Sequence, residues 1–207
     1  MPARYFCRGG EASLVCPQPV PGIFDNSNSQ INGNAQTKAR RTPVFDLPRG
    51  PVSHISSPDR RWTLIFECPD YTSERKLWIE DNQTHSRRFI RGFERSLGIS
   101  WAPDSRLFFV EDAYASNETL SYVFDPVTLK VSDLAKLLRA ADPENANYIQ
   151  VGHSYLRAKR WLNLQELLVT LKGYDDDPPH RGYSLKYRVH INGKVQKIYQ
   201  HLDGNWR

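Results

Sequence analysis

"SPDRRWTLIF" at residues 57–66 and "APDSRLFFV" at residues 102–110 are two versions of one short pattern, and they decide the fold. The Pro-Asp pair starts at Pro58 in the first copy and at Pro103 in the second, 45 residues later. In each copy a polar turn leads into a run of β-branched and aromatic residues, which is typical of a buried strand. Four-stranded units that repeat every 40–45 residues are typical of propeller blades.

Each copy extends into a unit of four predicted strands. The first unit has strands near 53–57, 62–67, 75–80 and 85–91, and the second near 98–102, 106–112, 119–124 and 128–132. A third, diverged unit follows in "RAKRWLNLQELLVTLKGY" and "GYSLKYRVHINGKVQKIYQ", where Asn192-Gly193 is a strong hairpin signal.

One helix is predicted between the second and third units, near residues 133–141. Ser132 is the expected N-cap, Leu134, Leu137, Leu138 and Ala141 form an apolar stripe at helical spacing, and Pro143 ends the helix. The predicted core consists of large apolar residues from the strands. These are Trp62, Phe66, Trp78, Trp101, Phe108, Phe124, Trp161, Leu168 and Val189.

These repeats resemble those of the β-propellers in the Tol-system translocation protein and in prolyl-oligopeptidase-type peptidases. The resemblance covers residues 53–132 well and 150–200 only in outline. Arg60 and Ser105 stand where the resembling repeats usually have glycine. About three blades are visible, and closed propellers have at least four. The fold class is therefore mainly β, as a partial or small propeller or an open, twisted stack of antiparallel sheets.

The chain of 207 residues is expected to have a flexible N-terminal arm, residues 1–42, and a single β-repeat domain, residues 43–207. The arm is rich in Gly, Pro, Asn, Ser and Gln and lacks apolar periodicity. Cys7 and Cys16 could close a loop in an oxidising compartment or be free thiols. The N-terminus has no complete signal peptide, and both an exported or periplasmic and a cytoplasmic location remain open.

The charge of the chain is unevenly distributed. Residues 1–61 hold eight Lys or Arg against four Asp or Glu, and the remainder holds 20 against 19. A nearly neutral body argues against a general nucleic-acid binder, so no nucleic-acid partner is predicted. No apolar run is long enough for a membrane-spanning helix.

No catalytic constellation is evident in the sequence. "VGHSYL" at residues 151–156 comes closest to a nucleophile elbow but lacks the last glycine. HExxH and P-loop motifs are missing, and the six histidines have no ligand spacing. No catalytic residue, metal site or cofactor is therefore predicted, and an enzyme is the less favoured reading.

Tyrosines and acids recur in the loops that join the second and third strands of each unit. If the units share one template, these loops lie on one rim, and turns with Arg60, Arg61, Arg106, Arg157, Lys159 and Arg160 lie on the other. The predicted partner-binding residues are Asp70, Tyr71, Asp112, Tyr114, Asn117, Tyr174, Asp175, Asp176, Asp177 and His180. Tyr side chains supply contact area at low entropic cost, and acids steer a basic partner.

The predicted function is a non-enzymatic protein-binding module, for example an exported inhibitor or immunity-type protein that neutralises a partner through this rim. A hydrolase with its site at the loop-bearing mouth of the sheets, using residues such as Asp175 and His180, is one alternative. An assembly component that pairs through an open sheet edge is another. The oligomeric state stays open.

Overall fold

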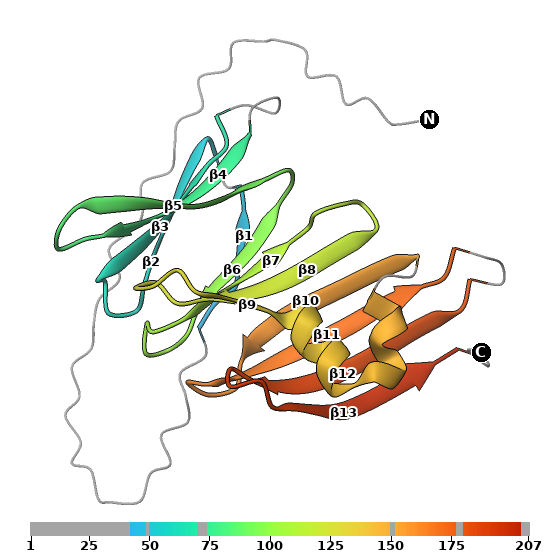
Figure 1. Ribbon diagram of the computed structural model, residues 1–207. Helices are drawn as coiled ribbons and strands as arrows, with labels where there is room; N and C mark the ends of the chain where they lie inside the picture. The colour runs from blue at the N-terminus through green and yellow to red at the C-terminus, as the bar shows by residue number, and fades with distance from the viewer. Residues whose placement is uncertain (1–41, 49, 70–73, 150–151, 177–179, 204–207) are drawn as a thin grey trace, which may run out of the picture. The chain divides into compact units, whose positions relative to one another are not determined.

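The structure is a computed structural model, and it describes residues 42–48, 50–69, 74–149, 152–176 and 180–203. The predicted arm, residues 1–42, lies outside this part apart from its last residue. The described chain is mainly β, as predicted, with strands in two sheets and a short helical segment (Figure 1). None of its helices is long and apolar enough to cross a membrane.

The first repeat forms a four-stranded antiparallel meander, in the order β2-β3-β4-β5. Its strands are β2 (Val52–Ser56), β3 (Trp62–Glu67), β4 (Arg75–Asp81) and β5 (Ser86–Phe93). All four lie within two residues of the predicted bounds, because the apolar alternation and the turn residues that mark them are local features of the chain.

The second repeat forms a similar meander with one added strand. Its strands are β6 (Leu97–Trp101), β7 (Phe108–Asp112), β8 (Glu118–Phe124) and the short β9 (Val131–Asp133). β1 (Phe45–Leu47), which precedes the first repeat in the chain, pairs antiparallel with β6 of the second repeat.

The third unit is a four-stranded meander that extends the sheet of the second repeat. Its strands are β10 (His153–Trp161), β11 (Glu166–Tyr174), β12 (Gly182–His190) and β13 (Val195–Leu202). β10 pairs in parallel with the start of β8, while β9 pairs with the end of β8, so a single large sheet results. The described strands do not close into a ring. Of the predicted alternatives, the structure therefore has the open one, with separate antiparallel meanders in two sheets.

The repeated Pro-Asp turns have nearly the same geometry. The Asp59 carboxylate accepts hydrogen bonds from the Ser57 hydroxyl at 2.6 Å and from the Arg61 backbone N–H at 3.0 Å. Arg60 has a φ of 61° and Ser105, at the matching place in the second turn, a φ of 64°. Both occupy the left-handed region that favours glycine, which explains why resembling repeats have glycine there.

The two turns also contact each other, since the Asp59 backbone N–H donates to the Ser105 hydroxyl at 3.0 Å. This contact distinguishes two otherwise equivalent glycine substitutions. Arg60→Gly should raise the free energy of unfolding by about 0.5–1 kcal/mol, because relief of the left-handed strain exceeds the added entropy of the unfolded chain.

Ser105→Gly relieves the same strain but removes the contact between the turns, worth about 1 kcal/mol. It should leave the stability unchanged or lower it. Urea denaturation of both variants measures the difference. Equal stabilisation by the two substitutions would show that the contact between the turns contributes nothing.

The predicted helix forms as α1 (Leu134–Ala141), but its N-cap is Asp133 and not Ser132. The Asp133 carboxylate accepts from the N–H groups of Ala135 at 2.8 Å and Lys136 at 3.1 Å. Both Ser132 and Asp133 are paired in β9, but the helix begins at Leu134, so Asp133 is the residue directly before it and Ser132 is one residue too early. From Pro143 onward the chain forms a 3-10 helix, η1 (Pro143–Ile149), which the sequence analysis did not predict.

Seven of the nine predicted core residues are buried, and Trp78 and Leu168 are not. Alternation along β4 and β11 places both on the opposite face from their buried neighbours Leu77 and Leu167.

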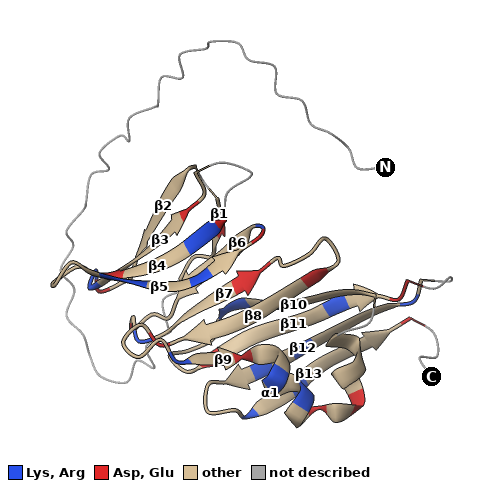
Figure 2. Ribbon diagram, turned by 45° about the horizontal axis from the view of Figure 1, so that its top comes forward, with Lys and Arg blue, Asp and Glu red and all other residues tan. Residues whose placement is uncertain are grey.

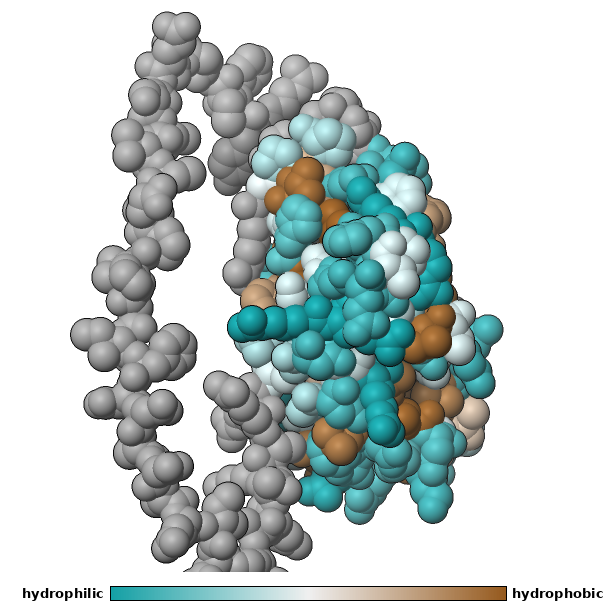
Figure 3. All heavy atoms as spheres, turned by 90° about the vertical axis from the view of Figure 1, so that its left-hand side faces the viewer, coloured by the Kyte–Doolittle hydropathy of each residue, from teal (hydrophilic) through white to brown (hydrophobic). Residues whose placement is uncertain are grey.

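The side shown in Figure 3, the left-hand side of Figure 1, is mostly hydrophilic with separate hydrophobic patches. On the outer face of its sheet, the Trp78 ring packs 5.1 Å from that of Phe89.

Candidate functional site

The predicted rim residues lie in three loops, which the structure describes to different extents. Asp70 and Tyr71, in the loop between β3 and β4, and Asp177, in the loop between β11 and β12, fall outside the described residues. Tyr114 and Asn117 lie in the loop from Ala113 to Asn117 between β7 and β8. Asp112 is the last residue of β7, and the remaining predicted residues stand at the end of β11 or between β11 and β12.

The second and third of these loops converge on the start of β10. Asn117 accepts a backbone hydrogen bond from Ser154 at 2.8 Å, and the Tyr155 hydroxyl donates to the Ser116 carbonyl at 3.3 Å. Gly152 has a φ of 57°, and a Cβ there would lie 2.5 Å from the Tyr174 carbonyl oxygen. The residue at 152 must therefore be glycine for the second and third loops to meet at this place.

An aromatic and histidine cluster stands where the loops meet. The Tyr174 ring stacks on the His153 ring, with centroids 4.2 Å apart, and His180 meets Tyr174 edge-on at 6.4 Å. His153 Nδ1 lies 3.0 Å from the Tyr155 hydroxyl, and its Nε2 lies 3.6 Å from an Asp176 carboxylate oxygen. We call His153, Tyr155, Tyr174, Asp176 and His180 the rim cluster.

The sequence analysis missed two members of the rim cluster, His153 and Tyr155. Both lie in "VGHSYL", which was considered only as a nucleophile elbow. Their alternate spacing places them on one face of β10, beside Tyr174 and Lys172 of β11. Recognising them required the pairing of β10 with β11, and the sequence analysis predicted a turn, not a strand, over part of β10.

The His180 ring and the Asp175 carboxylate are not hydrogen-bonded to each other. Asp175 is buried, and its carboxylate accepts from the Arg181 backbone N–H at 2.6 Å and from the Arg181 side chain at 2.9 Å. The His180 ring contacts the Asp175 backbone carbonyl at 3.2 Å and not its carboxylate. Asp175 therefore stabilises the loop from within, and Asp176 is the exposed acid of the described loop.

Asp112 is also buried, with 2% of its surface exposed, and it offers no contact area to a partner. Its Oδ2 lies 3.7 Å from the Arg91 guanidinium, and its Oδ1 has no hydrogen-bond partner among the described residues. Burial raises the pKa of Asp112, and the nearby Arg91 only partly opposes this.

Asp112→Asn should therefore stabilise the protein near neutral pH, since the ionised carboxylate is disfavoured in the folded state. The advantage of the variant should shrink as the pH falls through the raised pKa of Asp112, because the wild-type carboxyl becomes neutral as well. Thermal melts of both proteins between about pH 8 and pH 4 measure this difference.

Asp81→Asn is the control, because it should change the stability at neutral pH in the opposite direction. A hydrogen bond from the Gln83 N–H is the largest cause that lowers the pKa of Asp81, and Arg61 adds to it. The ionised Asp81 stabilises the folded state, and this contribution is lost as the pH falls through its lowered pKa. The Asn variant should be less stable at neutral pH, with a gap that closes in acid. If Asp112→Asn behaves in the same way, the Arg91 pair outweighs the burial of Asp112.

The basic residues predicted to lie in turns do so in the first two units, but not in the third. Arg60, Arg61 and Arg106 lie in the Pro-Asp turns. Arg157, Lys159 and Arg160 do not lie in a turn, because they belong to β10, and the turn between β10 and β11 is residues 162–165. The basic residues of the third unit thus lie on a sheet, where Figure 2 shows blue segments along β10 and β11.

Tyr114, in the loop between β7 and β8, is 49% exposed, and Tyr174, the last residue of β11, is 38% exposed. Tyr174 is held by its stacking on His153, so little side-chain entropy remains to be lost when a partner covers it. The exposed rim residues Tyr114, Asn117, Tyr174, Asp176 and His180 combine aromatic area with polar groups. Such a surface can bind another macromolecule.

No protein-family model matches the chain, and no curated protein sequence matches it. Three similar solved structures contain β-propellers or related domains, with low sequence identity. The β-propeller domain of the Trilobed protease from Pyrococcus furiosus is 15% identical, with a TM-score of 0.47, and the match covers 72% of this chain and 43% of that one.

The other two are TolB from Acinetobacter baumannii and an acylaminoacyl peptidase from Pyrococcus horikoshii. They are 15% and 13% identical, with TM-scores of 0.37 and 0.42 and coverages of 76% and 72% of this chain. The chain spans less than half the length of each of the three structures. Two of the meanders in this chain have a Pro-Asp turn between their first and second strands.

Proposed function

We propose that this protein is a non-enzymatic protein-binding module that contacts its partner through the loops at the start of β10. The observation that carries this proposal is the convergence of two loops, each with an exposed tyrosine, on Gly152–Tyr155. Exposed tyrosines on ordered loops are typical anchors of protein interfaces. An exported inhibitor or immunity-type protein is the form of this function that we favour.

The contacts of the rim cluster support binding rather than hydrolysis. Both carboxylate oxygens of Asp175 are engaged by Arg181, so the acid proposed for a hydrolase is already paired. Asp176 lies beside His153, and its side chain is 66% exposed, so it can steer a basic partner.

A photo-crosslinking amino acid placed at Tyr114 or Tyr174 tests the proposal in the native cells. Both positions should crosslink to the same discrete protein. The control position is Val127, in the turn between β8 and β9, which is 57% exposed. The proposal fails if Val127 gives the same product or if the two tyrosine positions give none.

The crosslinked protein is then purified and titrated against variants. Tyr114→Ala/Tyr174→Ala should weaken binding by more than tenfold, since each central anchor is worth on the order of 2 kcal/mol. The matched control, Val127→Ala/Val131→Ala, truncates two side chains of similar exposure and should bind normally. Equal affinities of all three proteins would place the partner elsewhere.

The sheet edge offers a second candidate function, as an assembly component. β13 is an eight-residue strand at the end of the large sheet, and most of its residues are exposed. An edge of this length can pair with a strand of another chain. Gel filtration distinguishes this candidate, because a protein that pairs with itself through β13 should not elute as a monomer.

A further inference from the structure

The meander β10–β13 has one covered face and one basic face. α1 and η1 cover the first face, where Leu156, Leu171 and Leu185 are fully buried in one core cluster with Leu138 (Figure 1). The strand pairings bring the alternate residues of the other face side by side. Among these are the cations Arg157, Arg160, Lys172, Lys186 and Arg188, with Lys159 at a bulge of β10.

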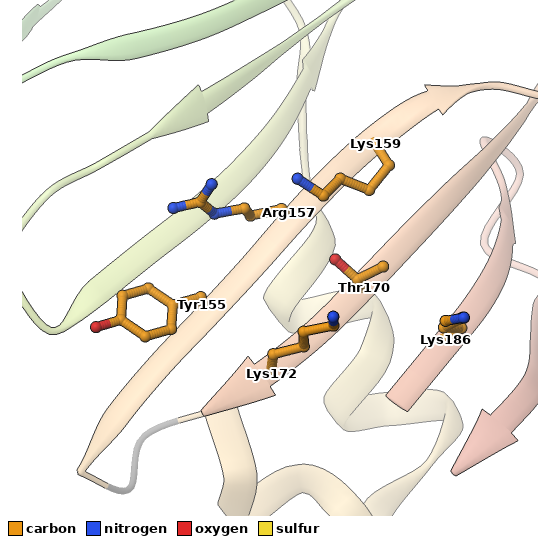
Figure 4. A pocket seen from close by; sticks show the side chains of 6 residues that line it. All are labelled: Tyr155, Arg157, Lys159, Thr170, Lys172 and Lys186. Atoms are coloured by element: carbon orange, nitrogen blue, oxygen red, sulfur yellow. The ribbon is translucent and has the colours of Figure 1, made fainter. Parts of the chain in front are cut away.

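A hollow of about 350 Å³ lies on the basic face, and we call it the basic hollow. Figure 4 shows its lining side chains on three neighbouring strands. They are Tyr155, Arg157, Lys159, Thr170, Lys172 and Lys186. In the part of the chain that the structure describes, none of these four cations forms an ion pair.

Acids also lie around the basic hollow, and two of them, Asp46 and Glu111, line a neighbouring hollow together with Arg157. Glu111 of β7 acts on Lys159 and Arg157 electrostatically, but burial raises the pKa of its carboxyl, which disfavours the ionised form. Glu166 and Asp203 lie near strand ends and accept local hydrogen bonds from Asn163 and Gly182.

Aromatic rings lie among the cations. Tyr155 lines the basic hollow, and the Arg157 guanidinium stands 5.8 Å from the centre of its ring. Tyr199 of β13 lies opposite Lys186, is 44% exposed and has the Lys186 ammonium 4.7 Å from its ring centre. A ligand with anionic groups and flat rings would match both features.

From this arrangement we propose that the basic face binds single-stranded nucleic acid, with phosphates on the cations of the basic hollow and bases stacked on Tyr199 and Tyr155. Basic grooves with interleaved aromatic side chains bind single strands in this way. A duplex could contact the cations through its phosphates, but its bases are paired and stacked and so would not stack on the tyrosine rings. An acidic peptide would use the cations but not the stacking surfaces.

The N-terminal segment is a poor occupant for the basic face, since residues 1–41 hold five Lys or Arg against two Asp or Glu. The proposal departs from the sequence prediction of no nucleic-acid partner. That prediction rested on the nearly neutral total charge of the body. The total does not reveal that strand pairing gathers six cations on one face.

Fluorescence anisotropy with a labelled oligothymidylate of about 12 nucleotides, a length within the usual site size, tests the proposal on the full chain. The single strand should bind, and the logarithm of the binding constant should fall with the logarithm of salt concentration by about 0.7 per phosphate neutralised. A duplex of the same length and a polyglutamate peptide should bind at least about tenfold more weakly. The proposal is overturned if the single strand does not bind at low salt, or if either competitor binds as tightly.

Charge-reversal variants locate the site. Lys172→Glu/Lys186→Glu should weaken binding at least about tenfold and reduce the salt slope by about 1.4, which corresponds to two lost phosphate contacts. The matched control, Lys130→Glu/Lys136→Glu, makes the same charge change at two exposed lysines of the β8–β9 turn and of α1. An equal loss in both variants would mean that the effect is one of net charge, against the proposal.

Substitutions of Tyr199 separate stacking from charge. Tyr199→Ala should weaken binding by about tenfold, because one stacked base is lost, whereas Tyr199→Phe should bind nearly as the wild type. Binding unchanged in Tyr199→Ala would remove the stacking part of the proposal and favour an acidic peptide ligand. Because Tyr199 is exposed, far-UV circular dichroism should show both variants folded.

Discussion

Replacing Trp101 by alanine is expected to lower the free energy of unfolding by about 3–5 kcal/mol, the usual cost of removing a large buried aromatic ring. Trp101 is only 2% exposed, and its ring centre lies 4.9 Å from that of Phe108. Its Nε1 donates to the Ile55 carbonyl at 3.3 Å, which connects β6 of the large sheet to β2 of the four-stranded sheet. Truncation would leave a cavity in the core cluster that both sheets share.

Urea denaturation at constant pH measures this loss, with Trp78→Ala as the matched control. The Trp78 ring lies on the outer face, against Phe89 and under the Arg87 guanidinium at 4.6 Å. Its removal should cost about 1–2 kcal/mol, mainly through the lost ring contacts. If the two alanine variants are equally stable, the shared core does not depend on Trp101 as the structure indicates.

The second large effect is expected for Gly173→Ala, which should lower the free energy of unfolding by about 3 kcal/mol. A Cβ at this position would lie 1.7 Å from the His153 carbonyl oxygen and 2.4 Å from the Tyr183 hydroxyl. The hydroxyl cannot move aside cheaply, because it donates to the Tyr148 carbonyl at 2.6 Å. Strands β10 and β11 would have to separate locally.

Gly182→Ala is the control, since it makes the same chemical change one strand away. The nearest atom to a Cβ at Gly182 would be an Asp203 carboxylate oxygen at 2.6 Å, at the end of a flexible and exposed side chain, and the Gly173 carbonyl oxygen would be in ordinary contact at 3.7 Å. This variant should be about as stable as the wild type. Thermal and urea denaturation of both variants measure the difference. A tolerated alanine at 173 would show that Tyr183 and β10 can shift together without cost.

Gly173→Ala also bears on the rim cluster, because Gly173 pairs with Ser154, between His153 and Tyr155. A displaced β10 should disturb the stacking of Tyr174 on His153. If the loops at this place bind a partner, the variant should lose binding together with stability. Gly182→Ala should preserve both.

The positions of the strands in both repeats followed from the sequence alone, as did the helix. Turn residues such as Pro58 and Asp59 act within a few neighbours, and apolar alternation depends only on the period of the backbone. Local geometry also accounts for Arg60 and Ser105, which adopt the left-handed conformation that the resembling repeats assign to glycine. The shift of the N-cap from Ser132 to Asp133 shows the limit of such signals, since either residue type can cap a helix and the residue at which α1 begins decided between them.

Longer-range pairing was decided only by the tertiary structure. The sequence does not show that β1 pairs with β6, or that β10 joins β8 in parallel, because such contacts depend on chain segments far apart. The rim cluster follows from these pairings, since they bring His153 beside Tyr174. The predicted residues in the loop between β11 and β12 were recognisable as polar from the sequence. The burial of Asp175, which is paired with Arg181, could not be recognised in that way.

The two faces of the meander show the difference most clearly. Alternation along β11 and β12 indicates that Lys172 and Lys186 lie on the other face of their strands from the apolar residues next to them in the sequence. The sequence by itself determined that much. Which apolar set is covered, and which cations become neighbours, depends on strand register and on the packing of α1. A side-chain period of two fixes the faces of one strand, but only hydrogen-bonded pairing aligns the faces of several strands into one surface.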